Sequence, residues 1–214
     1  YLGQNFYFEN QDYEKINPVV IIDDNEDIIP VRHNTTTSVG PLSLSIKDSI
    51  RAFIISCSLR DFRGYEKKHK TMMINITHLN ALQAQLAPKI EDYLKELKNS
   101  IENIIGYSTN DALANSTIRS FHETFMSKFD VEETFEDVLK TIRKAINKIK
   151  VYGINTQSKQ VLDYSIYPDG LSAIVIGGHK LSRGLTLEGL SVSYFARNSK
   201  AYDTLMQMCR WFGY

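Results

Sequence analysis

The sequence predicts an α/β fold in which a mostly parallel sheet is flanked by helices. The first observation is a set of short apolar runs of strand type, at 71–77, 148–155, 172–178 and 190–195. The second is that longer segments with helical periodicity lie between the first two runs and after the last one. Strands that alternate with helices are typical of a parallel sheet covered by helices.

The first helix is predicted at 45–59, where Ile46, Ile50, Phe53, Ile54 and Cys57 recur at helical spacing. Ser45 and Asp48 have the spacing of a capping box at its start. The segment before it is polar and irregular apart from PVVIIDD at 18–24. A basic run with two interleaved aromatic residues follows the helix, and this run could bind a phosphate backbone or remain solvated: Arg60, Arg63, Lys67, Lys68, His69 and Lys70.

After the first strand, a helix is expected from about Leu79, and a second from Pro88 to about Asn103. Residues 110–148 are expected to be helical throughout. Two apolar stripes support this expectation, one through Ala114, Ile118, Phe121 and Phe125 and another through Val131, Phe135, Val138, Leu139, Ile142 and Ile146. A last helix is expected at 201–212.

Composition sets limits on function. The chain has 214 residues, 43% of them hydrophobic, and a formal net charge of zero, so nucleic-acid binding would need a local basic patch. The two cysteines, Cys57 and Cys209, lack disulfide or metal spacing, which fits a cytoplasmic protein. No apolar run is long enough to span a membrane. Because the chain begins with Tyr1 and ends at Tyr214, we expect it to be part of a longer protein.

The connection KLSRGLTLEGLSVSYF, which begins at Lys180, is unusual for a link between two strands. The preceding strand delivers Gly177 and Gly178 to the carboxyl edge of the sheet, where parallel sheets bind ligands. Five residues that can donate hydrogen bonds follow: His179, Lys180, Ser182, Arg183 and Thr186. Arginine and backbone amides suit phosphate oxygens, although a solvated loop remains the alternative.

A second polar group lies in the segment YDTLMQMCRWFGY. Gln207 and Arg210 are three positions apart and would share one face of the last helix. Their burial among apolar residues would be costly without a partner, and a phosphate from another lobe is one such partner.

These two blocks, IGGHKLSRGLTLEGLSVSYF and YDTLMQMCRWFGY, resemble the Z1 domain family. This family comprises bacterial proteins of restriction or defence type, named as endonucleases and related to superfamily two helicases. The resemblance covers roughly 170–214. It implies a RecA-like second motor lobe over 43–214, with a helical insertion at about 88–148 and an entry segment at 1–42 that arrives from a preceding lobe.

The resemblance also implies roles for individual residues. Arg183, Gly184 and Leu185 match the fifth helicase motif, which binds nucleotide, and Thr186 stands in place of its aspartate. Gln207 and Arg210 match the sixth, catalytic motif, with one residue fewer between them and Cys209 in place of a glycine. His179, Lys180, Ser182 and His78 would contact the nucleic-acid backbone.

The implied cofactors are ATP and Mg²⁺, held mainly by the preceding ATPase lobe, because no phosphate-binding G-x-x-x-x-G-K-[ST] motif occurs in this chain. The implied partners are DNA, that lobe, and methyltransferase or nuclease subunits. The function implied for the intact protein is ATP-driven translocation along DNA.

Two alternatives remain open. The domain itself could be a metal-dependent endonuclease, for which the candidate carboxylates are Asp23, Asp24, Glu26 and Asp27, or Glu132, Glu133, Glu136 and Asp137. A solvated helix face explains the second group equally simply. The departures at Thr186 and Cys209 also leave room for a non-catalytic scaffold.

Overall fold

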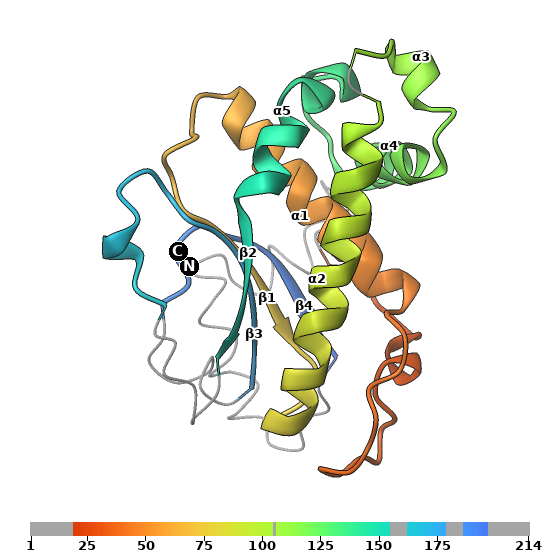
Figure 1. Cartoon of the computed structure of the whole chain (residues 1–214), viewed down its shortest axis with the longest axis vertical. Coiled ribbons are helices and arrows are strands. Elements are labelled where there is room, and N and C mark those ends of the chain that lie inside the picture. Colours follow the sequence, from red (N-terminus) through yellow and green to blue (C-terminus); the bar gives the residue numbers. More distant parts are fainter. Residues whose placement is uncertain (1–18, 105, 155–161, 179–185, 197–214) are drawn as a thin grey trace.

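The computed structural model describes residues 19–104, 106–154, 162–178 and 186–196. Within them the chain forms a four-stranded, all-parallel sheet with the order β2-β3-β1-β4 (Figure 1). The strands are β1 (Lys70–Asn75), β2 (Ile149–Ile154), β3 (Ser172–Gly177) and β4 (Leu190–Phe195). Each predicted strand is present, so the α/β fold and its parallel sheet are confirmed.

The helices pack against one face of this sheet. They are α1 (Leu44–Phe62), α2 (Asn80–Glu102), α3 (Thr109–Ala112), α4 (Ser116–Lys128) and α5 (Phe135–Lys148). Figure 1 shows them above and to the right of the strands, with the segment 162–171 on the left. The main core joins the helices to Met72, Ile74 and Ile174 of the sheet, whereas Met73 and Val175 face a smaller cluster with Leu171 and Leu187.

Two predicted helix boundaries were wrong. The helices expected before and after Pro88 form one continuous α2, with Pro88 on its exposed side. A proline inside a helix removes the bond to the carbonyl four residues earlier, here that of Ala84, which also lies on the exposed side where water can replace the bond.

The segment 110–148 was predicted as uninterrupted helix, yet it contains three helices. The Asn115 side chain accepts hydrogen bonds from the amides of Thr117 and Ile118 and thereby starts α4. Thr134 and Asp137 form a reciprocal capping box that starts α5. The apolar stripes were predicted correctly at Phe121, Phe125, Val138 and Ile142, which are buried, but not at Ala114, which is exposed.

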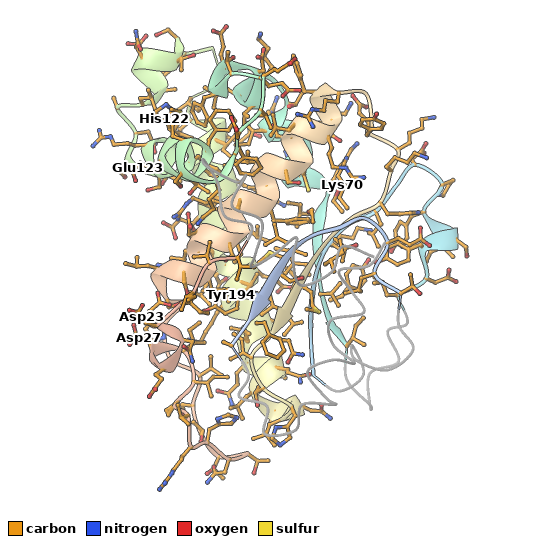
Figure 2. The ribbon with its side chains drawn as sticks, turned by 180° about the vertical axis from the view of Figure 1, so that it is seen from behind. Asp23, Asp27, Lys70, His122, Glu123 and Tyr194 are labelled. Carbon is orange, nitrogen blue, oxygen red and sulfur yellow. The ribbon has the colours of Figure 1, made fainter. Side chains whose placement is uncertain are left out.

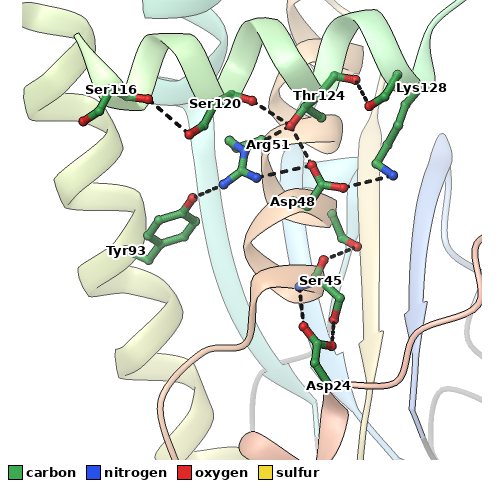
Figure 3. A network of polar contacts seen from close by, with 11 residues as sticks. Asp24, Ser45, Asp48, Arg51, Tyr93, Ser116, Ser120, Thr124 and Lys128 are labelled. Carbon is green, nitrogen blue, oxygen red and sulfur yellow. Dashed lines mark hydrogen bonds and ion pairs between the residues drawn. The ribbon is translucent and has the colours of Figure 1, made fainter.

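The start of α1 also differs from the prediction. Ser45 and Asp48 do not form a capping box, since the N-cap is Ser43 and its side chain makes no capping hydrogen bond. Asp48 instead accepts hydrogen bonds from Thr124 Oγ1 at 2.6 Å and pairs with Lys128 Nζ at 2.9 Å, both on α4. Arg51 completes this network by donating to the Tyr93 hydroxyl of α2 at 3.0 Å (Figure 3). The network therefore ties α1 to two other helices.

A buried ion pair lies at the amino end of the central strand. Lys70 and Asp61 are 1% and 3% exposed, and Lys70 Nζ bonds to Asp61 Oδ1. The backbone amide of Lys70 donates to Leu171 O at 2.8 Å, so the same residue joins β1 to the start of β3. Nearby, burial raises the pKa of the Cys57 thiol to about 12. Figure 2 shows Lys70 beneath the end of α1.

No helix among the described residues is long and apolar enough to cross a membrane.

The buried pair gives a first prediction. Lys70→Met leaves Asp61 buried without its counter-charge, so the free energy of unfolding should fall by about 3–5 kcal/mol. The double variant Lys70→Met with Asp61→Leu removes both charges and should recover most of that loss. Urea denaturation followed by circular dichroism measures both values. Equal destabilisation of the single and double variants would contradict the role of the uncompensated charge.

The Asp48 network gives a pH-dependent prediction. Burial raises the pKa of Asp48, but the bonds from Thr124 and Lys128 outweigh it and hold the pKa below 3.8. A lowered folded-state pKa contributes stability that is present above the unfolded pKa and is lost as the pH falls through the folded pKa. Asp48→Asn should therefore cost about 1–2 kcal/mol near neutral pH. The difference from the wild-type protein should shrink between about pH 5 and about pH 3, and a difference independent of pH would exclude this account.

Candidate functional site

The carboxyl edge of the sheet is the candidate site. The strands are parallel, so the residues that follow β1, β3 and β4 emerge at the same edge. After β1 the chain runs through Thr77 and His78 into α2, and after β3 it reaches Gly178. The amide of Ala196, which follows β4, donates to Asn75 O at 3.1 Å and holds the exits of β4 and β1 together.

Thr77 organises the turn between β1 and α2. Its hydroxyl oxygen accepts a hydrogen bond from the Leu79 amide at 3.1 Å and lies 2.9 Å from His33 Nε2. His33 Nδ1 is 2.8 Å from Pro30 O, which can only accept, so Nδ1 carries the proton. In the neutral ring, Nε2 therefore accepts from the Thr77 hydroxyl. This contact fixes the entry segment against the carboxyl edge.

Gly178 and Gln83 form a close contact at the same edge. Gln83 Nε2 donates to Thr77 O at 2.9 Å, and Gln83 is only 4% exposed. A Cβ on Gly178 would lie 2.9 Å from that nitrogen, 3.0 Å from His78 Cα and 3.1 Å from Thr77 O. The absence of a side chain thus lets the exit of β3 lie directly against the exit of β1. Protein atoms of α2 and of the exit of β1 therefore fill the space beside this glycine.

The carbonyl oxygen of the Gln83 side chain is a hydrogen-bond acceptor at this edge that no described residue uses. Its Oε1 is buried and has no hydrogen-bond partner among the described residues. Rotating the amide would set that oxygen against Thr77 O, so the assigned orientation is the favourable one. A buried carbonyl of this kind is stabilised when it receives a hydrogen bond. The carboxyl edge therefore offers a fixed acceptor beside the exits of two strands.

Asp24 and Ser45 fix the outer strand of this edge. Asp24 accepts from the Ser45 amide at 2.9 Å and from the Ser45 hydroxyl (Figure 3). That hydroxyl in turn lies 2.8 Å from the Tyr194 hydroxyl of β4. Burial raises the pKa of Asp24, but the bonds from Ser45 outweigh it and lower the pKa overall. Burial likewise raises the pKa of Tyr194. Asp24 thus stabilises the start of α1.

Two of the predicted contact residues are described. His78 is exposed at the carboxyl edge, beside the backbone of Gly178, and its ring centroid lies 6.5 Å from that of His33. Thr186 is exposed on the connection that leads into β4. The other predicted residues lie outside the described residues: His179, Lys180, Ser182, Arg183, Gly184, Gln207 and Arg210.

Thr186 is remote from His78. The next two residues have joined the amino end of the sheet, where Leu187 is buried beside Met73 and Glu188 O accepts from Thr71 Oγ1 at 2.7 Å. Strand β1 separates Thr71 from His78 by roughly 20 Å, whereas Thr186 lies within about 7 Å of Glu188 along the chain. His78 and Thr186 are therefore too far apart to contact the same chemical group of a ligand.

The acidic clusters that could hold a metal are engaged elsewhere. Asp24 binds Ser45, and Asp23 and Asp27 lie on the outer surface near η2 (Asn25–Asp27), as Figure 2 shows. Asp137 belongs to the capping box of α5. Among the described residues, no group of three histidine, cysteine, aspartate or glutamate side chains could hold a metal ion.

The basic run after α1 is mostly occupied by internal contacts. Arg63 forms two bonds to Glu133, at 2.6 and 2.8 Å, and this lowers the pKa of Glu133 to about 2. Lys67 lies 3.5 Å from Asp169, and His69 Nδ1 accepts from the Leu171 amide at 3.0 Å. These contacts lie at the amino end of the sheet, away from His78. They favour a structural role for the run over phosphate binding.

Sequence reasoning missed the residues that shape the carboxyl edge. Gln83 had a detectable signal, because it interrupts the apolar stripe of α2 beside Leu82 and Leu86. His33 had none, since it lies in an irregular segment 44 positions before its partner Thr77.

The contact at Gly178 gives a third prediction. Gly178→Ala forces the exits of β1 and β3 apart and should lower the free energy of unfolding by about 1–3 kcal/mol. Gly153→Ala on β2 is the matched control, because a Cβ there meets nothing within 4 Å and should cost little. Chemical denaturation of both variants measures the difference, and equal stabilities would refute the close contact.

Comparison with known proteins gave one family. The family model described as the Z1 domain matches residues 45–214, which include every described strand and helix from α1 onward. No curated protein and no solved structure matches the chain. The match covers well over half of the sequence and contains the exits of β1, β3 and β4. The chain therefore belongs to the Z1 domain family.

Proposed function

We propose that this chain is a RecA-like C-terminal motor lobe of an ATP-dependent DNA helicase or translocase from a restriction or defence system. Membership of the Z1 domain family and an all-parallel sheet flanked by helices both support this role. In such a motor, the second lobe closes on nucleotide held by a preceding lobe and moves along the nucleic-acid backbone.

The observation that carries the proposal is the convergence of three strand exits at one edge. The predicted backbone-contacting segment begins directly after Gly178, and the segment with Gln207 and Arg210 continues from Ala196. The exits of β3 and β4 lie on either side of β1, whose own exit presents His78. Residues from both segments thus start from neighbouring points of a rigid sheet, as a shared ligand cleft requires.

The proposed roles follow the resemblance. Arg183 and Arg210 would respond to the triphosphate, with Gly184, Thr186 and Gln207 as supporting contacts. ATP and Mg²⁺ would be held mainly by the preceding lobe. His78, His179, Lys180 and Ser182 would bind DNA phosphates, a sequence-independent contact that suits a translocating motor.

The described residues contain no observation that favours either alternative. An endonuclease centre in this chain would need clustered carboxylates, whereas Asp24 is bonded to Ser45, Asp137 belongs to a capping box and Glu133 is paired with Arg63. A non-catalytic scaffold would keep the fold without hydrolysis. Both alternatives predict that nucleotide turnover is independent of Arg210.

DNA-stimulated ATP hydrolysis by the full-length protein tests the proposal. Arg210→Ala removes a charged donor from the developing phosphate charge and should lower the maximal rate by about 100-fold. Arg143→Ala is the matched control, because Arg143 forms an exposed ion pair with Glu102 on the helical layer and should leave the rate unchanged.

An unchanged rate in Arg210→Ala would refute the motor assignment in favour of a scaffold. Metal-dependent cleavage of DNA by this chain, abolished by Asp23→Ala with Asp24→Ala, would instead establish the endonuclease alternative. Circular dichroism of each variant excludes loss of fold as the cause.

A further inference from the structure

Strand β2 ends the described sheet on the side opposite β4. Among the described residues it pairs with β3 alone, so one row of its backbone N–H and C=O groups has no strand beside it. The strand is also incompletely covered, since Lys150 is exposed and Val151, Tyr152 and Gly153 are half-buried. An uncovered strand edge is a template for pairing with another extended chain.

A hollow lies between this edge and α2. It has a volume of about 380 Å³ and is lined by Glu91, Leu94, Lys95 and Lys98 of α2 and by residues 149–151 of β2. Leu94 and Val151 supply apolar surface, and Leu94 is nearly buried. The backbone groups of β2 that pair with no strand among the described residues therefore lie beside a small apolar surface. This arrangement is used when a peptide adds a strand to a sheet.

Two lysines at this hollow lack an ion pair among the described residues, although Glu91 lines the hollow with them. Lys95 and Lys98 form no ion pair among the described residues, although lysines elsewhere on the helical layer do, such as Lys140 with Asp137 and Lys144 with Glu66. On the opposite face of β2, the Lys150 ammonium lies 4.9 Å from the centre of the Tyr167 ring. Positive charge thus flanks the strand edge on both faces.

We propose that this edge docks an extended acidic segment of a partner protein. The segment would add as a fifth strand beside β2. Its carboxylates, at alternate positions, would share one face of the added strand and reach Lys95 and Lys98, while the intervening apolar residues would lie on the opposite face beside Tyr152 and Tyr167. Backbone pairing supplies affinity, and the lysines select acidic sequences.

The charge pattern argues against two other occupants. A second copy of this chain, paired through the same edge, would bring its own lysines against these lysines, and like charges across an interface are unfavourable. Nucleic acid is disfavoured because phosphates leave the backbone groups of the strand edge and the apolar surface of the hollow without matching groups.

Synthetic ten-residue peptides and the intact chain test the proposal. The probe is a fluorescent peptide of alternating Glu and Val, compared with its Lys and Val counterpart. Two further acidic peptides carry N-methyl groups on alternate residues, in one frame or the other. Only one frame removes the N–H groups that face β2, so only one should abolish binding. Fluorescence anisotropy measures affinity, and amide NMR shifts at 149–154 locate the contact.

The acidic peptide should bind, and Lys95→Glu with Lys98→Glu should weaken binding by about tenfold. Lys68→Glu with Lys89→Glu is the matched control, because it makes the same charge change at lysines outside the hollow and should have little effect. The proposal is overturned if both N-methylated peptides bind equally, if no acidic peptide binds, or if an oligonucleotide shifts the 149–154 amides and the peptides do not. A concentration-dependent dimer that uses these amides would also overturn it.

Discussion

The ion pair between Lys70 and Asp61 is the constraint on which the sheet depends. Lys70 opens the central strand and is buried, so its charge is tolerable only where a carboxylate meets it. Asp61 lies in the last turn of α1, and this requirement therefore fixes the end of that helix against the start of β1. The same amino end is tightly packed, since Gly189 has φ +67° and a Cβ there would lie 1.9 Å from His69 O. Neither α1 nor β1 can shift without separating Asp61 from Lys70, and the separation would leave a buried charge unpaired.

Because the amino end of the sheet is fixed, the residues at its carboxyl edge also have defined positions. With β1 held in register against β3 and β4, the exits at Thr77, Gly178 and Ala196 occupy set places. Each is then joined to a second element, Thr77 to His33 and the exit of β4, through Tyr194, to Ser45. The functional edge is thus supported by polar contacts from the entry segment and from the start of α1, not by the strands alone.

The sequence was sufficient to predict the strands and most of the helical segments, but not several of the residues at which the helices begin and end. Strands and apolar stripes follow from local hydrophobic periodicity, which is why β1, β3 and the buried face of α5 were predicted correctly. The continuity of α2 through Pro88 depends on solvent reaching the displaced carbonyl, a property of the folded surface. The role of Asp48 depends on α4, which lies 76 positions away at Thr124. Local patterns contain no information about such partners.

In the candidate site, too, some features follow from local sequence and topology and others depend on residues that are distant in the chain. The position of Gly178 at the carboxyl edge follows from parallel topology, but the reason for a glycine there, the side chain of Gln83, required the packing of α2. The basic run after α1 was ambiguous in sequence, because its carboxylate partners Glu133 and Asp169 lie 70 or more positions away. Charge patterns of this kind become interpretable only once distant carboxylates are placed.

The strand order has a consequence for how the protein is made. The contact between His69 and Leu171, which joins β1 to the start of β3, spans 102 positions. A ribosome adding about 5–20 residues per second leaves the apolar β1 without strand neighbours for roughly five to twenty seconds. During that interval only α1, α2 and the later helices can shield it, so the helical layer acts as a temporary cover for a strand that would otherwise associate with other nascent chains.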